Sequence, residues 1–394
     1  MFIPRLISAR LQSEIETKET VVITGMRQVG KTTLLRRLFE TIPSLNKAFL
    51  DIGNPLHRKI FEEENFDAIW NNLAFHKVSN TQKAYLFLDE VQNLPTIGQA
   101  VKYLGDHWPV KFFLTGSSSY YLKNLFSESL AGRKLIFELF PLTFQEFLAF
   151  RGATPLPKAE WSVKDKKKNK ITHEQYLPFY REFMEFGGFP AVVLEPNIER
   201  KRYLLEEVFR SYFEQDVKSL ADFSNLSKLR DLILLLVNRI GSKVDISKLA
   251  SELQTSRITI YDYLGFLEQT YFLSLLSPFS RNFDRQAAGS KKVFFADCGL
   301  ANFLGKLSPG QLFENSIFQN LRPKSRSLHF FSRRDSEIDF VVNEKIALEA
   351  KLTGSAREVA NLRKKSQTLK LKESYLVSLN WIKENQGIIM APLL

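Results

Sequence analysis

The sequence has little cysteine and no long apolar run. Its one cysteine, Cys298, excludes a disulfide within the chain and a metal site built from several cysteines. The longest apolar runs, such as residues 232–237, are far shorter than the stretch of about 20 residues that spans a bilayer. The first five residues, Met-Phe-Ile-Pro-Arg, also lack the basic and then apolar layout of a signal peptide. These absences predict a protein of the reducing cytoplasm that has no membrane partner.

Length and charge narrow the class of protein further. A chain of 394 residues is too long for one ordinary domain, so we expect two or three. Its 44% apolar and 25% charged residues are typical of a globular protein. Lysine and arginine exceed aspartate and glutamate by 55 − 43 = 12, which favours a polyanionic partner, nucleic acid first. The alternative is that the excess charge only aids solubility.

Residues 21–32 read Val-Val-Ile-Thr-Gly-Met-Arg-Gln-Val-Gly-Lys-Thr, the spacing of a phosphate-binding loop after β-prone residues. Apolar residues at helical spacing follow, so the context is strand, loop and helix. Gly25 and Gly30 let backbone N–H groups curl around a polyphosphate at the positive end of that helix. We expect Lys31 to reach the β- and γ-phosphates of ATP and the Thr32 hydroxyl to hold Mg²⁺, with Thr33 also binding the nucleotide. The alternative is a chance match in a glycine turn.

Further apolar runs predict strands that are buried on both faces of a parallel sheet. One of them ends in Asp89 and Glu90. We expect Asp89 to order the Mg²⁺ shell and Glu90 to polarise the attacking water as a general base. The alternative is two solvated carboxylates at the end of a strand. The predicted strands after the first lie at residues 47–52, 84–90, 110–116 and 134–139.

Hydroxyl side chains follow the strand at 110–116, and an arginine precedes the last strand. Ser117 is placed to sense the γ-phosphate, whereas Ser118 or Ser119 is equally suited to cap a short helix predicted at 120–130. Arg133 lies where proteins of the AAA+ class commonly place an arginine finger, so by that resemblance it would stabilise charge on the nucleotide of a neighbouring subunit. The alternative for Arg133 is a pair with a surface carboxylate.

These motifs together resemble a prokaryotic AAA+ family, labelled AAA_14, whose members usually carry a carboxyl-terminal region labelled DUF4143. The sequences at 25–32, 89–90, 114–118, 130–133 and 141–147 carry the first part of the likeness. Gly-Gly-Phe-Pro at 187–190, Lys-Val-Phe-Phe-Ala-Asp at 292–297 and Phe-Glu-Asn at 313–315 resemble the second. The resemblance implies an α/β P-loop AAA+ ATPase with a helical lid. It also implies the sensor role of Ser117, the finger role of Arg133 and an oligomer, expected to be a hexameric ring.

The middle of the chain is predicted to be helical. Residues 153–171 contain a lysine-rich insertion that either touches phosphate backbones or is only a solvated loop. Two short amphipathic helices at 245–253 and 256–268 follow, and β-prone residues at 271–276 and 278–281 are expected to form a hairpin. This pattern is typical of a winged helix-turn-helix, which contacts either DNA or protein. The residues expected on the exposed face of the second helix are Ser256, Arg257, Thr259 and Asp262.

A second group of candidate catalytic residues lies near the carboxyl end of the chain. Strands are predicted at 337–342 and 346–351, joined by a turn centred on residue 344. That register sets Asp339 opposite Glu349, and the alternation of strands places both on one face with Lys351. Because two facing carboxylates repel each other, a divalent cation such as Mg²⁺ or Mn²⁺ would relieve the repulsion.

This hairpin resembles the PD-(D/E)XK nuclease fold, with Ile338 at the position where the family name has proline. The resemblance implies that Asp339 and Glu349 bind metal, Glu314 completes the site and Lys351 orients or activates water. Glu337 is expected to be a solvated neighbour on the other face. The alternative is a degenerate fold that is retained for binding or assembly.

The sequence therefore predicts four parts and leaves three functions open. The parts are an ATPase core at 1–142, a helical lid at 143–225, a winged helix at 226–290 and a nuclease-like domain at 291–394. The first function is ATP-driven processing of branched or broken DNA, including cleavage. The second is DNA remodelling or branch migration without cleavage. The third is a nucleotide-dependent switch that acts on a protein partner.

Overall fold

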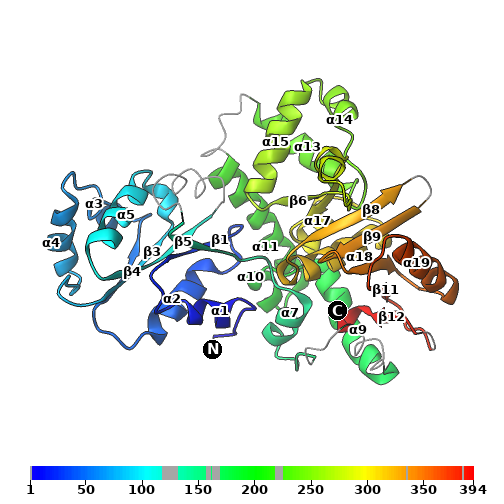
Figure 1. Cartoon of the computed structure of the whole chain (residues 1–394), viewed down its shortest axis with the longest axis horizontal. Coiled ribbons are helices and arrows are strands. Elements are labelled where there is room, and N and C mark those ends of the chain that lie inside the picture. The colour runs from blue at the N-terminus through cyan, green and yellow to red at the C-terminus, as the bar shows by residue number, and fades with distance from the viewer. Residues whose placement is uncertain are drawn as a thin grey trace. The chain divides into compact units, whose positions relative to one another are not determined.

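The chain divides into two compact units in the computed structural model (Figure 1). The structure describes residues 2–117, 132–156, 161, 169–217, 225–333, 336–383 and 386–394. Unit 1 comprises residues 1–140 and 269–271, and unit 2 comprises residues 141–268 and 272–394. The division of unit 2 into lid, winged helix and nuclease-like domain stays a prediction.

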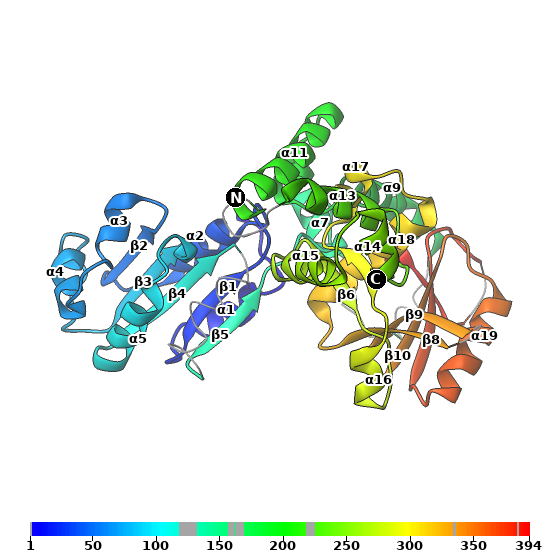
Figure 2. The ribbon, with the colours of Figure 1, turned by 90° about the horizontal axis from the view of Figure 1, so that it is seen from above.

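Unit 1 is built on a parallel sheet (Figure 2, blue to cyan). Among the described residues the sheet has five strands in the order β2-β3-β4-β1-β5, and every neighbouring pair is parallel. This confirms the predicted parallel sheet. The strands are β1 (Thr20–Thr24), β2 (Lys47–Asp51), β3 (Ala84–Asp89), β4 (Val110–Gly116) and β5 (Lys134–Glu138). The helices are α1 (Ser8–Ser13), α2 (Lys31–Thr41), α3 (Pro55–Lys59), α4 (Ile69–Ala74) and α5 (Ile97–His107), with 3-10 turns at Phe66–Ala68 and Val91–Asn93.

The middle residues of the central strands β1, β3 and β4 are mostly apolar and buried because helices cover both faces of the sheet. On one face Phe39 of α2 contacts the rings of Phe49 and Phe87 edge-on. On the other face the alternate strand residues, among them Leu86 and Leu114, belong to a buried core that also includes residues of α4 and α5. Burial of this kind contributes about 25 cal/mol per Å² of apolar surface and so dominates the stability of the unit.

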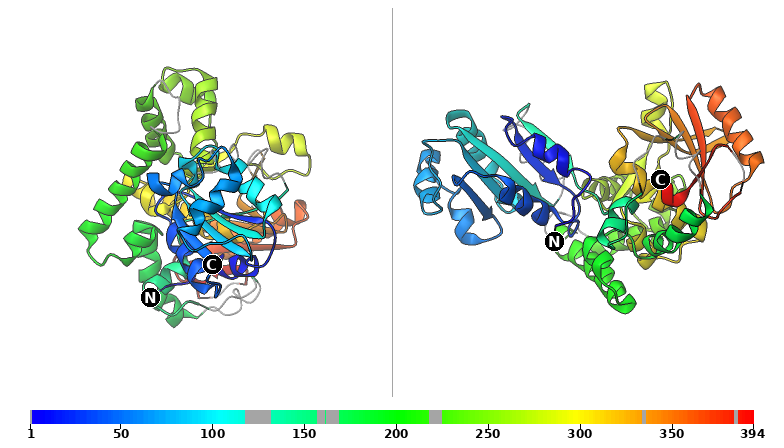
Figure 3. Two further views of the ribbon diagram at one scale, coloured as in Figure 1. Left: turned by 90° about the vertical axis from the view of Figure 1, so that its left-hand side faces the viewer. Right: turned by 90° about the horizontal axis from the view of Figure 1, so that it is seen from below.

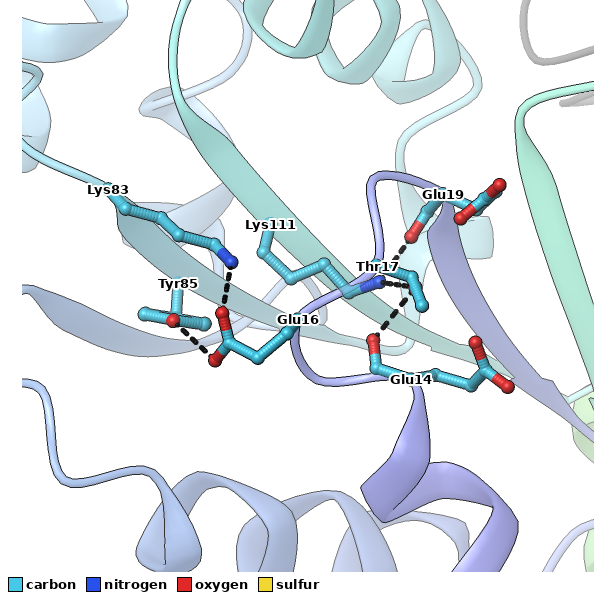
Figure 4. A network of polar contacts seen from close by, with 7 residues as sticks. All are labelled: Glu14, Glu16, Thr17, Glu19, Lys83, Tyr85 and Lys111. Carbon is cyan, nitrogen blue, oxygen red and sulfur yellow. Dashed lines mark hydrogen bonds and ion pairs between the residues drawn. The ribbon is translucent and has the colours of Figure 1, made fainter.

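The amino ends of the strands carry a polar network (Figure 4). Lys111 of β4 is 1% exposed, and its ammonium donates to the Thr17 hydroxyl at 2.9 Å and to the Glu19 carbonyl. Beside it, Glu16 accepts hydrogen bonds from Lys83 at 2.7 Å and from the Tyr85 hydroxyl at 3.0 Å. Burial lowers the pKa of Lys111 to about 8, against an ordinary value of 10.5.

We therefore expect Lys111 to make the free energy of unfolding depend on pH. Between pH 8 and 10.5 the unfolded chain keeps the Lys111 proton while the folded chain has lost it, so stability rises with pH in this window. A Lys111→Met variant should lack this rise, whereas Lys18→Met, which changes an exposed lysine of the same unit, should keep it. The measurement is the denaturant midpoint at several pH values. Parallel curves for Lys111→Met and the wild type would contradict the assignment.

Unit 2 begins with a set of helices. Thr143 starts the first of them with a capping box, in which its hydroxyl accepts from the Glu146 N–H and the Glu146 carboxylate accepts from the Thr143 N–H. The α-helical segment Ile198–Ser211 continues as one π-helical segment, Tyr212–Val217. The helices before the two-helix segment are α7 (Phe144–Phe150), α9 (Lys170–Phe186), α10 (Pro190–Leu194), α11 (Ile198–Ser211) and α13 (Leu226–Val237).

The two helices predicted at 245–253 and 256–268 are present. The hairpin predicted to follow them is not formed by the residues that were expected to pair. Helices α14 (Ile246–Glu252) and α15 (Arg257–Gln269) follow each other across a short turn. Strand β6 (Leu273–Leu276) pairs antiparallel with β7 (Lys292–Phe295) and not with residues 278–281. Pro278 has no N–H for a hairpin ladder, and it instead forms a parallel bridge with Phe330. The segment between the two strands contains α16 (Phe283–Ala288).

The exposed face of α15 is nearly neutral. Ser256, Arg257 and Asp262 are exposed as predicted, and Thr259 is half-buried. Arg257 and Asp262 carry opposite charges, while Ile258 and Tyr261 are 72% and 61% exposed. This face therefore lacks the positive charge that phosphate contacts need.

The carboxyl-terminal sheet of unit 2 has the order β12-β11-β10-β9-β8 (Figure 3, orange to red). The β9–β10 pairs join Phe340 to Leu348 and Val342 to Ile346, which confirms the predicted register. Helix α19 covers one face with Leu362 against Ala347, and Phe294 lies against Phe340 on the other. The strands are β8 (Leu328–Arg333), β9 (Ser336–Val342), β10 (Ile346–Lys351), β11 (Glu373–Ser378) and β12 (Ile388–Met390). The helices are α17 (Cys298–Leu304), α18 (Pro309–Leu321) and α19 (Ala356–Thr368), with 3-10 turns at Arg322–Lys324 and Ala391–Leu393.

The sequence motifs at 187–190 and 292–297 meet inside unit 2. The Asp297 carboxylate is fully buried and accepts from the Gly188 N–H at 2.6 Å, the Leu300 N–H at 2.9 Å and the Gln319 amide at 3.0 Å. Gly187 has φ of +76°, and a Cβ there would lie 1.9 Å from the Asp297 carboxylate. The two motifs therefore have a structural role, since glycine at 187 is required by both backbone conformation and space.

Several predictions fall outside the described residues. They are Ser118, Ser119, the helix at 120–130 and most of the lysine-rich insertion. Within the part of the chain that the structure describes, no helix has the length and apolar character needed to cross a membrane.

Candidate functional site

The predicted phosphate loop follows β1 and leads into α2. Gly25 and Gly30 have φ of +149° and +97°, so both adopt backbone conformations that favour glycine. A Cβ at Gly25 would lie 2.1 Å from the Leu139 carbonyl oxygen, which explains why this position has no side chain. The loop thus brings its backbone to the start of α2, where N–H groups have no partner within the helix and favour an anion.

Two cationic side chains brace the loop. Lys31 is 5% exposed, and its ammonium donates to the carbonyls of Gly25 at 2.8 Å and Met26 at 2.9 Å. Arg5 donates to the Val29 carbonyl at 2.7 Å and to the Phe140 carbonyl at 2.6 Å. The Lys31 ammonium therefore lies against the loop backbone, and its contact with the phosphates stays a prediction. Arg5 is a supporting residue that sequence reasoning missed.

Asp89 lies at the carboxyl end of β3 and is 4% exposed. Its carboxylate accepts a hydrogen bond from the Thr115 hydroxyl of β4. Burial raises the pKa of Asp89, hydrogen bonds from Thr115 and Thr32 oppose that rise, and the carboxylates of Glu90 and Asp51 add to it. The structure thus brings together Thr32 and Asp89, the two residues predicted to hold Mg²⁺.

Glu90 follows Asp89 in a left-handed conformation with φ of 55°. Its carboxylate accepts from the Ser117 hydroxyl at 3.0 Å and from the Gln92 amide, and its N–H donates to the Thr115 hydroxyl at 3.2 Å. The side chains of Glu90, the predicted base, and Ser117, the predicted phosphate sensor, are therefore hydrogen-bonded to each other. Gln92 was missed by sequence reasoning, although a polar residue two positions after the carboxylate pair was a usable signal.

This set of groups fits ATP with Mg²⁺. The loop supplies backbone N–H groups and an ammonium, and Thr32 and Asp89 supply the oxygen ligands that Mg²⁺ prefers. Bound Mg²⁺ would neutralise charge on the phosphates. Thr33 is exposed beside Thr32, and its contact with the nucleotide stays a prediction.

Arg133 pairs with Asp106 of α5, and the Arg133 side chain is 54% exposed. This ion pair with a surface carboxylate is the alternative to an arginine finger that the sequence left open for Arg133. An exposed ion pair contributes little to stability, about 0–1 kcal/mol. Arg133 can therefore leave Asp106 at little cost and bind an anion on another molecule. The finger role of Arg133 stays a prediction.

If Arg133 acts on a neighbouring subunit, Arg133→Ala should lower ATP hydrolysis by about 10³-fold and leave ATP affinity within a few fold. Mixing Arg133→Ala with Glu90→Gln subunits should restore activity, because some interfaces then join an intact base to an intact arginine. Asp106→Ala is the control, since it removes the surface pair and keeps the arginine. Hydrolysis by Arg133→Ala at the level of Asp106→Ala would exclude the finger.

The acidic residues predicted in the carboxyl-terminal domain form a cluster with two lysines. Lys292 of β7 is 3% exposed, and its ammonium lies 3.5 Å from Glu314 and 2.5 Å from Glu337. Lys365 of α19 lies 2.7 Å from the Glu349 carboxylate. Glu337 was expected to be a solvated neighbour on the other face. Its side chain is 51% exposed, but its carboxylate pairs with Lys292 and raises the pKa of Asp339, so Glu337 belongs to the cluster.

Burial perturbs the carboxyl groups of this cluster. It raises the pKa of Glu314 to about 8, helped by the Asp339 carboxylate and opposed by Lys292. It also raises the pKa of Asp339, whose carboxylate accepts the Ala350 N–H at 2.8 Å. Burial raises the pKa of Glu349 as well, and Lys365 opposes that rise. Lys351 lowers the pKa of both Asp339 and Glu349, so all four predicted residues lie close enough to interact.

The predicted metal site of this cluster stays a prediction. In the described ranges no three histidine, cysteine, aspartate or glutamate side chains form a group that could hold a metal ion. The lysine ammonium groups instead supply positive charge beside Glu314 and Glu349. Sequence reasoning missed this role of Lys292 and Lys365, because they come from β7 and α19 and not from the hairpin.

Three family models match consecutive parts of the chain. Residues 17–148 match AAA_14, described as an AAA domain. Residues 178–311 match DUF8612 and residues 309–393 match DUF4143, both described as domains of unknown function. The first and third matches support an AAA-type ATPase. The motifs at 187–190 and 292–297 fall within the DUF8612 match, which corrects their expected assignment to DUF4143.

Relatives are found in archaea and bacteria. An uncharacterized protein of Methanocaldococcus jannaschii is 29% identical over 388 residues, which cover 93% of this chain and 83% of the relative. An uncharacterized protein of Haemophilus influenzae is 25% identical over 356 residues, which cover 85% of this chain and 82% of the relative.

Solved structures include distant neighbours. The Aeropyrum pernix ORC1 protein in complex with DNA has a TM-score of 0.30 and 14% identity, with 77% of this chain and 92% of that chain covered. Domain III of the Thermotoga maritima replication initiation protein DnaA has a TM-score of 0.27 and 16% identity, with 52% and 94% covered.

Proposed function

We propose that the chain is an ATP-hydrolysing AAA-type protein that processes DNA. The observation that carries the ATPase part is the convergence of Lys31, Thr32, Asp89 and Glu90 at the carboxyl edge of one parallel sheet. These groups can bind polyphosphate and Mg²⁺ and can polarise a water molecule. We further propose that it acts in the cytoplasm as a homo-oligomer, most simply a hexameric ring.

The proposal that the chain processes DNA rests on its net positive charge. The net charge of +12 favours a polyanion, and branched or broken DNA would suit an ATP-driven protein of this kind. The near-neutral face of α15 argues that this helix is not the main DNA contact.

Cleavage of that DNA at Asp339 and Glu349 is the finer proposal. It is supported by the register of the hairpin and by the interaction of Asp339, Glu349 and Lys351. The second candidate, DNA remodelling without cleavage, is favoured by the pairs that Lys292 and Lys365 form with the carboxylates. Such pairs already neutralise charge that a metal ion would otherwise balance.

The third candidate is a nucleotide-dependent switch with a protein partner. The exposed Ile258 and Tyr261 of α15 favour it, because exposed apolar side chains that lie together often mark protein contacts.

One set of DNA-binding and DNA-nicking assays distinguishes the three candidate functions. Single-stranded, duplex, forked and four-way DNA are tested for binding at low salt and for nicking with Mg²⁺ or Mn²⁺, with and without ATP. The variants are Lys31→Ala, Asp339→Asn and, as a matched control in the same hairpin, Glu344→Gln. Nicking that survives Lys31→Ala and Glu344→Gln but is lost in Asp339→Asn supports cleavage. Binding without nicking supports remodelling, and no binding to any DNA contradicts the proposal.

A further inference from the structure

Unit 2 contains a groove of about 640 Å³ that none of the predicted site residues lines. Its walls come from the segment after β6, from β8 and from the carboxyl end of α19. Four cationic side chains line it, and all four are exposed: Lys243, Arg281, Arg333 and Lys370. We call this feature the basic groove.

Among the described residues, the side chains that line the basic groove carry positive charge and no negative charge. Its described lining residues include no aspartate or glutamate. No ion pair is found for any of its four cations within the part of the chain that the structure describes. Arg281 donates to the Leu369 carbonyl, at 3.4 Å. Four unpaired cations around one groove attract a ligand with several negative charges.

Aromatic rings form part of the same walls. Phe279 and Phe331 line the groove and are partly exposed, so one surface of each is available to a ligand. Single-stranded nucleic acid offers both phosphates and unstacked base faces, and bases stack on aromatic side chains. A duplex keeps its bases stacked inside and could place only phosphates here. A volume of 640 Å³ is that of a small-molecule pocket and suits one or two nucleotides of a strand.

The groove also adjoins the acidic cluster. Ser332 of its wall is the strand partner of Glu337, and Lys243 is bridged to Lys292. Glu337 and Lys292 are the ion pair beside Glu314. A nucleic-acid strand held in the groove therefore lies beside the β-strand residue paired with Glu337, whose carboxylate interacts with that of Asp339.

We propose that the basic groove binds single-stranded nucleic acid, with phosphates at Lys243, Arg281, Arg333 and Lys370 and bases against Phe279 and Phe331. This deepens the proposed function and rests on it for the class of partner.

The test is binding of a fluorescein-labelled 12-nucleotide oligothymidylate to the full chain at low salt, followed by anisotropy. The variant is Arg281→Glu/Lys370→Glu, and the control is Lys18→Glu/Lys306→Glu, which changes net charge equally at exposed lysines outside the groove. The groove variant should bind at least tenfold more weakly, and the slope of log affinity against log salt should fall by about 1.4. The control should bind within about twofold of the wild type.

Phe279→Leu keeps an apolar side chain and removes the ring, so it tests stacking. It should weaken binding of the oligonucleotide about fivefold or more and leave binding of a 12-base-pair duplex unchanged. Two results with the groove variant would overturn the proposal: oligonucleotide affinity that falls as much in the control, or affinity that does not fall at all. A Phe279→Leu variant that loses affinity for the duplex and the single strand equally would also overturn it. Failure of the proposed function is distinguishable, since the wild type would then bind none of these nucleic acids.

Discussion

Replacing Lys31 with alanine is expected to lower ATP hydrolysis by about 100-fold or more. The ammonium of Lys31 lies inside the phosphate loop and donates to the Gly25 and Met26 carbonyls, so it is held ready for an anion. Removing one preorganised donor from a charged site costs about 10²–10³-fold in rate. The measurement is phosphate release at saturating ATP, together with the affinity for a labelled ATP analogue.

Lys47 provides a matched control for this prediction. Its ammonium also donates to two backbone carbonyls, those of Phe39 and Ile42, but it lies at the other end of α2. Lys47→Ala therefore removes a similar set of hydrogen bonds without touching the loop. Hydrolysis that falls equally in Lys31→Ala and Lys47→Ala would mean that the loss is structural and would refute the role of Lys31.

Replacing Asp297 with alanine is expected to give the largest loss of stability. Three buried donors, the N–H groups of Gly188 and Leu300 and the amide of Gln319, would lose their acceptor. Each unsatisfied buried donor costs about 1–3 kcal/mol, so the loss should be about 4 kcal/mol or more. That is a large part of the 5–15 kcal/mol that stabilises an ordinary domain. Urea unfolding followed by tryptophan fluorescence measures it.

Asp245 is the control for Asp297, because both are aspartates that cap a helix. Asp245 is exposed and accepts one hydrogen bond among the described residues, from the Lys248 N–H, so Asp245→Ala should cost about 1 kcal/mol. The difference between the two variants isolates the buried network. Equal losses would show that Asp297 acts only as a helix cap.

The features that sequence predicted best are local in the chain. The phosphate loop depends on spacing within twelve residues, from 21 to 32, and the hairpin register depends on one turn at 343–345. Backbone geometry fixes both, since positive φ at Gly25 and Gly30 and the alternation of strand side chains follow from short-range sterics.

The features that sequence could not supply depend on packing between distant segments. Lys292 reaches Glu314 because β7 pairs with β6, and the predicted hairpin had given β6 a different partner. Lys365 reaches Glu349 because α19 packs on β10, and nothing in the spacing of α19 marks that lysine among its neighbours. Arg5 likewise contacts residues that are far along the chain.

The two hydrogen bonds of Arg5 have a mechanical consequence. One guanidinium holds both the Val29 carbonyl in the loop and the Phe140 carbonyl, at the residue where the chain leaves unit 1. Any shift of the loop that exceeds the reach of a hydrogen bond must either break one of these links or pull on the exit point of the chain. A movement of the phosphate loop would therefore be transmitted through the Arg5 side chain to the backbone at Phe140.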